Sequence, residues 1–269
     1  MNDSFDLDAY LRRIRWSGSL APGLDTLARL LRAHMQSIPF ENLDVLLGRP
    51  IRLDLAGVQA KLVGASRGGY CFEHCALFAA ALEALGFEPL RHAARVTLYM
   101  PHSAAPRTHM FLSVPLAEGT FVVDPGFGAL APRVPVPLQA GVLARLDSES
   151  HWMGRDGRFW VLHAQAGAEP VQAWASTLEK ECAADFDLSN HYTSTHPASP
   201  FVNRILLRAL TDDGRVTVAN REFTLRRGST TQTAQLADRA ALRAVLEQYF
   251  GFDLPEVEQL AVPSIPEWT

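Results

Sequence analysis

Apolar residues recur at helical spacing in the first third of the chain. Leucines and a methionine return every three or four positions between residues 24 and 36, and Pro39 then ends the pattern. Residues 7–14 repeat the spacing on a shorter scale. Residues 72–85 place Phe72, Cys75, Phe78 and Leu82 on one side of a helix. The first third is therefore predicted to be helical.

The middle of the chain changes to the alternation that is typical of strands. The expected strands are residues 90–100, 109–116, 120–124, 158–164 and 170–175. A proline-rich stretch at 131–141 interrupts them, and it is expected to be a loop because proline cannot donate in the middle of a sheet. Further strands are expected at 203–210, 215–220 and 221–227, followed by an amphipathic helix at 237–250. This order predicts an α+β protein with three sub-domains instead of an alternating parallel sheet.

Composition and charge exclude several classes of protein. The 269 residues carry a formal net charge of −4 from interspersed residues of both signs, which does not favour nucleic acid as a partner. No apolar run approaches the roughly 20 residues that a membrane helix needs. The acidic N-terminal stretch lacks the features of a signal peptide. Three cysteines are too few for a disulfide framework, so a reducing, cytoplasmic setting is expected.

The strongest chemical signal is the stretch from Arg67 to Glu73, RGGYCFE. Two glycines predict a tight turn, and a helix begins immediately after it, so Cys71 lies at a helix N-terminus. The partial positive charge there favours the thiolate form of cysteine, and backbone N–H groups at this position suit an oxyanion. The alternative is that Cys71 is a small buried apolar residue, which is equally common for cysteine.

A thiol nucleophile requires a base, and the base requires an acid that orients it. His109 begins an apolar strand and Asp124 ends the next one. A hairpin through residues 117–119 would bring these two side chains close together. The alternative is that His109 is an ordinary strand-edge residue and Asp124 a turn former. Glu41 and Arg67 are expected to have a structural role, as a buried ion pair that joins the second helix to the cysteine turn.

The stretch RGGYCFE resembles the catalytic-cysteine signature of the arylamine N-acetyltransferases. Further matching elements are Pro39 to Asn42, Thr108-His109, Asp124 to Gly128 (DPGFG) and Tyr192 to Pro197 (YTSTHP), so the resemblance extends over roughly residues 5–255. It implies an N-terminal helical bundle at 1–86 that carries the cysteine. A central antiparallel β-barrel at 87–190 carries the histidine and aspartate, and a C-terminal α/β lid occupies 191–269. The three side chains would form a papain-like Cys-His-Asp core.

The resemblance also implies a reaction. An acetyl or other short acyl group would pass from acyl-CoA to an arylamine or hydrazine by a ping-pong mechanism, through a thioester on Cys71. Acetyl-CoA would be the donor co-substrate, an aromatic amine the acceptor, and no metal would take part. The catalytic residues would be Cys71, His109 and Asp124; the CoA contacts Gly126, Gly128, Thr193, Ser194 and Thr195; and the acceptor pocket Phe40, Val96 and Phe127. For the three pocket residues, core packing is an equally good interpretation.

The sequence departs from the family pattern at two positions, because Cys75 stands where asparagine is usual and Pro125 where small branched residues are commoner. Cys71, His74, Cys75 and His109 therefore raise the possibility of a zinc site. Two further hypotheses keep the triad but change the acceptor: an amide synthase that closes a macrolactam from an aryl-amine polyketide chain, or a hydrolase that uses water. The alternative that is not an enzyme is a non-catalytic CoA-binding module.

Overall fold

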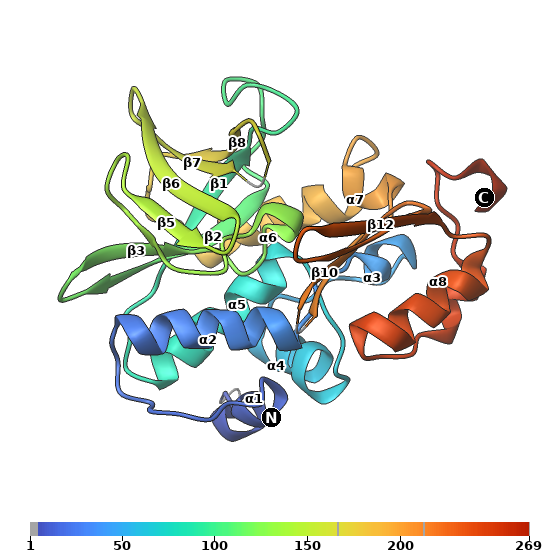
Figure 1. Ribbon diagram of the computed structural model, residues 1–269, viewed down its shortest axis with the longest axis horizontal. Coiled ribbons are helices and arrows are strands. Elements are labelled where there is room, and N and C mark those ends of the chain that lie inside the picture. Colours follow the sequence, from blue (N-terminus) through green and yellow to red (C-terminus); the bar gives the residue numbers. More distant parts are fainter. Residues whose placement is uncertain (1–4, 166, 212, 269) are drawn as a thin grey trace.

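The computed structural model describes residues 5–165, 167–211 and 213–268. Helices make up the beginning of the chain and lie below two separate sheets in Figure 1. The predicted helices at 7–14, 24–36 and 72–85 are confirmed, whereas three shorter elements between residues 43 and 64 were not predicted. These elements are α1 (Leu7–Arg13), α2 (Leu24–Ser37), α3 (Leu43–Leu46), α4 (Leu55–Gln59), the π-helical turn η1 (Ala60–Gly64) and α5 (Cys71–Ala84).

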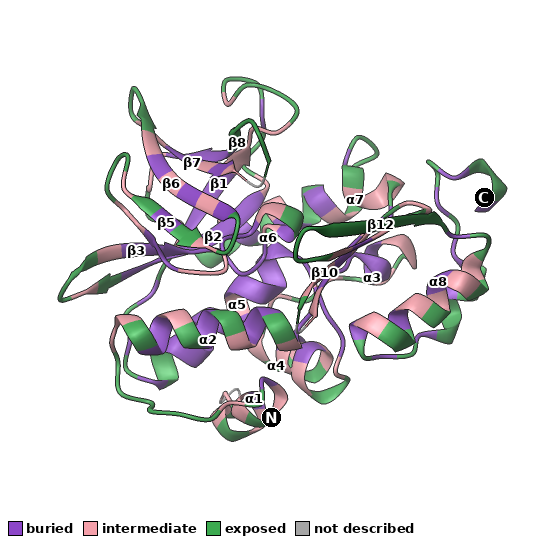
Figure 2. Ribbon diagram, in the orientation of Figure 1, coloured by how far each residue is buried: buried purple, intermediate pink, exposed green. Residues whose placement is uncertain are grey.

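Helix α5 is buried around almost its whole circumference (Figure 2). The sequence predicted one apolar side, but Leu77 on another face is also fully buried, as are the polar Glu73 and His74. Helix α2 follows the ordinary amphipathic pattern, with a buried stripe that includes Leu27 and Leu30 and an exposed opposite face. Because α5 is enclosed on all sides, the position of its N-terminus is fixed by packing.

The middle of the chain forms one antiparallel sheet of eight strands in the order β4-β3-β2-β1-β8-β7-β6-β5. An isolated bridge between Ala140, after β4, and Met153 of β6 brings the two ends together, so the sheet is a nearly closed barrel (Figure 1). Its interior contains Phe111, Met153, Leu162 and Trp174. The strands are β1 (Leu90–Val96), β2 (His109–Leu116), β3 (Gly119–Val123), β4 (Val136–Pro137), β5 (Leu143–Leu146), β6 (Glu149–Asp156), β7 (Phe159–Gln165) and β8 (Val171–Ser176). A 3₁₀ turn, η2 (Gly128–Leu130), precedes β4.

The last part of the chain is a four-stranded antiparallel meander with helices around it. Strand β9 begins at Leu206, later than predicted, because residues up to Asn203 belong to a helix. The elements are α6 (Ala183–Thr195), α7 (Pro200–Asn203), β9 (Leu206–Thr211), β10 (Gly214–Ala219), β11 (Glu222–Arg227), β12 (Thr230–Gln235), α8 (Arg239–Val245), the π-helical turn η3 (Leu246–Phe250) and the 3₁₀ turns η4 (Pro255–Gln259) and η5 (Pro266–Trp268). The α+β class is confirmed. The division at residues 86 and 190 stays a prediction, and α6 lies across the second boundary.

Two contacts fasten the meander to the helical part. Phe40 and Arg208 exchange backbone hydrogen bonds of 2.8 and 2.9 Å, which adds the segment after α2 to the edge of β9. The Asn42 amide donates to the carbonyls of Phe201 and Arg204, each at 2.8 Å, and accepts from the backbone N–H of Leu206 at 2.9 Å. Among the described residues, no helix is long and apolar enough to cross a membrane.

The predicted ion pair between Glu41 and Arg67 is confirmed, and it belongs to a larger buried cluster. Arg67 Nη2 lies 2.6 Å from Glu41 Oε1 and 3.3 Å from Asp44. Lys61 lies 2.9 Å from Asp44 and 2.8 Å from Glu73, which is in the first turn of α5. Burial would lower the pKa of Lys61, but the surrounding carboxylates raise it instead. Each buried charge therefore depends on its partners.

Removing one cation from this buried cluster should lower the stability of the protein. Arg67→Met leaves Glu41 buried without its main partner, and the free energy of unfolding is expected to fall by about 3–5 kcal/mol. The matched control is Arg52→Met, which breaks the exposed pair with Asp54, whose side chains are 63% and 51% exposed. Urea unfolding should show a much smaller loss for the control. Equal losses in the two variants would contradict a role for burial.

Candidate active site

Cys71 is the first residue of α5, and the glycines before it allow the chain to approach closely. A side chain on Gly68 would collide with the carbonyl oxygen of Pro39. That same carbonyl accepts a hydrogen bond of 3.2 Å from the backbone N–H of Gly69. The carboxylate of Glu73 accepts from the N–H of the helix N-cap residue at 3.0 Å. The thiol is thus held at a helix N-terminus, as the sequence predicted.

The predicted hairpin brings His109 and Asp124 together. Strands β2 and β3 pair so that Leu112 faces Val123, which places Asp124, just beyond β3, diagonally across from His109. His109 Nε2 lies 2.8 Å from Asp124 Oδ2. Both residues are buried, His109 at 3% exposure and Asp124 at 0%. Their hydrogen bond is therefore shielded from solvent.

Trp174 of β8 is a member of this site that sequence reasoning missed. Its indole Nε1 donates to the same oxygen of Asp124 at 2.9 Å, and its ring stacks on Phe111 with centroids 4.1 Å apart. The only signal that could have found it is the sheet order, since β8 pairs with β1 beside β2. Asp124 Oδ2 thus accepts from both Trp174 and His109, and this fixes the orientation of the carboxylate.

The electrostatics of His109 are set by its two neighbours. Burial alone would lower its pKa, but the charge of Asp124, the hydrogen bond to Asp124 and a hydrogen bond with Cys71 raise the pKa of His109 to about 10. Because Nε2 faces Asp124, Nδ1 is the nitrogen left for Cys71. The Sγ atom of Cys71 also lies 3.9 Å from the carbonyl oxygen of Thr108. The structure therefore joins His109 to Asp124 and places both near Cys71, whereas a catalytic triad of the three residues stays a prediction.

The segment after Asp124 covers these residues. An ideal Cβ on Gly126 would lie only 2.5 Å from the Cα of Cys71, so no side chain fits between the two backbones. Phe127 sets its ring edge-on against His109 at a centroid distance of 4.9 Å. Gly128 has a φ of +68° and lies against the ring of Phe40. Gly126 thus lies against the nucleophile, and contacts of Gly126 and Gly128 with CoA stay a prediction.

The three residues expected to contact an acceptor are all half-buried. Phe40 lies against Gly128 and is stacked on His74 with centroids 6.5 Å apart. Val96 pairs with Trp174 across β1 and β8. Of these three residues, Phe127 packs against His109. The role of all three as an apolar wall for the acceptor stays a prediction.

The predicted CoA contacts at 193–195 lie at the end of α6. Their hydroxyls donate to helix carbonyls four residues earlier, with Thr193 and Ser194 at 2.8 Å and Thr195 at 2.6 Å. Thr193 is only 2% exposed. The same helix reaches the cysteine turn through a short hydrogen bond from the Tyr70 hydroxyl to Asn190. A CoA role for these three residues stays a prediction.

Known proteins share both the sequence and the arrangement. The N-acetyltransferase family model matches residues 23–259. The chain is 37% identical over 260 residues to the arylamine N-acetyltransferase of Mycolicibacterium smegmatis, with 94% of each chain covered. The chain belongs to the arylamine N-acetyltransferase family. The enzyme of that name from Escherichia coli K12 is 35% identical over 254 residues, which cover 94% of this chain and 90% of the relative.

Solved structures of the arylamine N-acetyltransferase family share the fold. That of the Mycobacterium marinum enzyme in complex with CoA matches with a TM-score of 0.89 at 33% identity and covers 94% of each chain. The predicted α+β architecture is thereby confirmed. The chain is an acetyltransferase, and this sets aside the hypothesis of a non-catalytic module.

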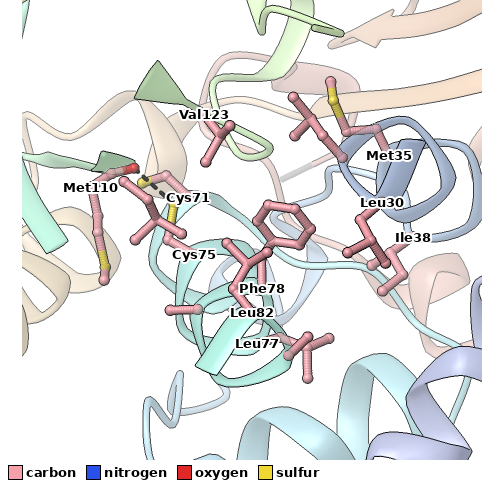
Figure 3. Packing of buried hydrophobic residues seen from close by; sticks show 14 of the residues in the cluster. Leu30, Met35, Ile38, Cys71, Cys75, Leu77, Phe78, Leu82, Met110 and Val123 are labelled. Atoms are coloured by element: carbon pink, nitrogen blue, oxygen red, sulfur yellow. Dashed lines mark hydrogen bonds between the residues drawn. The ribbon is translucent and has the colours of Figure 1, made fainter. Parts of the chain in front are cut away.

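Cys75, which stands where the family signature usually has asparagine, makes a hydrogen bond of its own. The Cys75 thiol donates to the carbonyl oxygen of Met110 at 3.1 Å, and the sulfur is fully buried (Figure 3). Burial raises the pKa of Cys75, so the group stays a neutral thiol. Met110 directly follows His109, so this hydrogen bond fastens the start of β2 to α5. Cys75 thus joins the two elements that carry the nucleophile and the imidazole.

His74 faces away from the cysteines, so the ligand set considered for zinc is not assembled. His74 Nδ1 lies 2.9 Å from His34 Nε2, and its own Nε2 lies 3.2 Å from the carbonyl oxygen of Pro39. His34 Nδ1 in turn lies 3.0 Å from the Tyr10 hydroxyl. Within the described part of the chain, no group of three or more histidine, cysteine, aspartate or glutamate residues is arranged to hold a metal ion.

The raised pKa of His109 predicts a pH dependence of stability. A group whose pKa rises from 6.5 to about 10 on folding contributes stability that is fully present below pH 6.5 and is lost as the pH rises through about 10. Urea unfolding between pH 6 and pH 10 should show this loss, on the order of a few kcal/mol, in the native sequence. Asp124→Asn removes the charge that raises the pKa, so its curve should be flatter. Parallel curves would contradict the ion pair.

The hydrogen bond of Cys75 predicts an order of stability among its variants. Cys75→Ala removes the donor and should lower the free energy of unfolding by about 1–3 kcal/mol, because the sulfur and its buried contact are both lost. Cys75→Ser keeps a donor of similar shape and should lose less. Urea unfolding of both variants measures the difference. If the alanine variant is as stable as the serine variant, packing alone explains the residue.

Proposed function

We propose that this protein transfers an acetyl group from acetyl-CoA to an arylamine or hydrazine by a ping-pong mechanism. The observation that carries the proposal is the buried hydrogen bond between His109 and Asp124, near Cys71 at the N-terminus of α5. Relatives that align over 94% of the chain are named arylamine N-acetyltransferases, and one related structure contains CoA. Cys71 is the nucleophile, His109 the acid and base, and Asp124 its orienter.

In the first half-reaction the donor loads the enzyme. His109 carries a proton near neutral pH because its pKa is about 10. A neighbouring imidazolium and a helix N-terminus both favour a thiolate, so the nucleophile in this proposal is the thiolate of Cys71. The thiolate attacks the carbonyl carbon of acetyl-CoA and forms a new carbon–sulfur bond. The bond to the CoA sulfur breaks, and His109 gives its proton to the departing CoA thiolate. The products are free CoA, an acetyl thioester on Cys71 and a neutral His109.

In the second half-reaction the acceptor removes the acetyl group. The amine nitrogen attacks the thioester carbonyl, and the now neutral His109 takes the proton that this nitrogen loses. Cys71 leaves as a thiolate, which restores the nucleophile. An arylamine suits this step because its nitrogen is largely unprotonated at neutral pH. Asp124 and Trp174 keep the imidazole oriented in both steps through the 2.8 and 2.9 Å hydrogen bonds to Asp124 Oδ2.

Substrates reach the sulfur past the surrounding aromatic side chains. Cys71 and His109 are each only 3% exposed, so entry requires half-buried residues such as Phe127 and Phe40 to shift. Flat apolar walls of this kind match an aromatic ring. Gly126 and Gly128 have no side chains, so their backbone can come close to the thioester and pantetheine. All three cysteines are free, which fits the reducing environment of the cytoplasm.

The proposal is tested by intact-mass spectrometry of the protein mixed with acetyl-CoA. The native sequence should gain one acetyl group, which a neutral arylamine such as 4-aminobenzamide then removes as the amide. Cys71→Ala should gain none, because the nucleophile is absent. Asp124→Asn should load more slowly by orders of magnitude, by analogy with the roughly 10⁴-fold effect in serine triads. Acetylation of the Cys71→Ala protein would refute the assignment of the nucleophile.

The same experiment distinguishes an acetyltransferase from a hydrolase and from an amide synthase with the same triad. A hydrolase would lose its acetyl group to water at the same rate with and without an amine. An amide synthase would load but would not pass the group to a separate small amine. Turnover that depends on a free arylamine would exclude both of these reactions.

A further inference from the structure

We propose that two copies of this chain associate edge to edge through strand β12, so that their two meanders form one continuous antiparallel sheet. This inference concerns assembly and does not rest on the proposed function. Its basis is a fully exposed edge strand, Thr230–Gln235, which has none of the features that keep sheet edges from pairing with another chain.

The outer side of β12 is open. The strand is the last one in the meander order β12-β11-β10-β9, and all six of its residues are exposed. Figure 2 shows β12 in front of the sheet and exposed along its whole length. Within the described part of the chain, no strand or isolated bridge pairs with its outer side. An edge of this kind offers a row of backbone N–H and C=O groups to a further strand.

The pairing of β12 with β11 shows which backbone groups point outward. Leu236, directly after β12, donates its N–H to the carbonyl oxygen of Arg221 at 2.8 Å. Hydrogen-bonded pairs alternate along an antiparallel ladder, and the register of β12 on β11 is continuous. The even-numbered residues of β12 therefore bond to β11. The N–H and C=O groups of Thr231, Thr233 and Gln235 point outward.

The other sheet edges are covered or blunted. The edge of β9 pairs with Phe40 through backbone hydrogen bonds. In the barrel, β4 has two residues and contains Pro137, and β5 has four residues and contains Arg145. Short length, proline and charge all disfavour pairing with another chain. In contrast, Thr230–Gln235 contains no charge, proline or glycine, and half of its residues are threonine, which favours strands.

A second copy of the chain is the partner that fits this edge. A two-fold axis at Thr233 places Thr233 opposite its counterpart and Thr231 opposite Gln235 of the second copy, so all three outward residues are used. Thr231 continues this row to Arg226 of its own β11. Gln235 continues it to Glu222 in β11 of the second copy. Each row therefore ends in opposite charges, and the junction itself carries none, so the pairing is complementary.

The assembly should stop at two copies. Of the two edges of the described meander, only that of β12 is free, because Phe40 occupies that of β9. A pair of copies related by a two-fold axis uses both free edges and is closed. One pair of six-residue strands is a small contact, of the transient class that buries less than about 1,200 Å². The dimer is therefore expected to form only as the concentration rises.

Sedimentation velocity measured from about 1 µM to about 1 mM tests the proposal. The native sequence should shift from monomer to dimer over this range. Thr233→Pro removes an outward N–H from each copy and leaves the bonds to β11 in place, so it should weaken the dimer about tenfold or more. The control is Thr233→Ala, which keeps the N–H and should weaken the dimer far less. A native protein that stays monomeric, or a proline variant that pairs as well as the native one, would overturn the inference.

A pair of charged variants tests the same contact without proline. Because Thr233 faces its counterpart across the axis, Thr233→Lys and Thr233→Glu each bring like charges together, and each alone should be largely monomeric. An equimolar mixture should dimerise, since lysine then faces glutamate. Gln172→Lys, the same change of charge at an exposed residue of β8, is the control and should leave the dimer unchanged. A mixture that pairs no better than either variant alone would contradict the two-fold axis at Thr233.

Amide hydrogen exchange, followed residue by residue by NMR, locates the contact. In concentrated protein the outward amides of Thr231, Thr233 and Gln235 should exchange more slowly than in dilute protein. The amides of Gln232 and Ala234, which already bond to β11, should change little. Slower exchange at another surface instead, or growth into assemblies larger than a dimer, would refute pairing through β12.

Discussion

The close approach of the 39–41 segment to the turn before α5 is the constraint on which the site depends. Gly69 hydrogen-bonds on one side to Pro39 and on the other to Glu41, and Gly68 leaves no space for a side chain between the two strands of chain. The charged cluster around Lys61 fixes the same turn. A helix start that is held from several directions loses little entropy when the thiol reacts, and preorganisation of this kind lowers the cost of catalysis.

A chain of hydrogen bonds satisfies the buried polar side chains of Tyr10, His34 and His74. Burial lowers the pKa of His74 to about 4 and that of His34 well below its ordinary value, so both rings are neutral and each has one N–H. Tyr10 then donates to His34, His34 to His74, and His74 to the carbonyl oxygen of Pro39. This line of three side chains connects α1, α2 and α5. A fully satisfied buried network favours one arrangement of the helices over others.

The elements that sequence reasoning identified are those with apolar periodicity, and the missed ones lack it for a physical reason. In β6 the buried alternating positions are Glu149, His151 and Met153, so two of three inward side chains are polar. Helix α6 buries Phe186, Asn190 and Thr193. Because two of these three residues are polar, the sequence of α6 shows no apolar stripe. All six residues of β12 are exposed, because it is an edge strand.

At the candidate site, the positions of Cys71, His109 and Asp124 were predictable, because local motifs mark the helix start and the strand ends on which they lie. The position of Trp174 was not predictable, because only the tertiary pairing of β8 with β1 brings it to Asp124.

The Asn42 amide has a consequence for how the molecule is made. Its three hydrogen bonds reach residues about 160 positions later in the chain, at the end of α7 and the start of β9. Contacts of such sequence separation form late, because a long loop must close before they form. During synthesis the nucleophile, its base and its acid would all have left the ribosome while this amide still lacked its partners. The nascent chain therefore contains all three of these residues well before α7 and β9 can pack against the helical part.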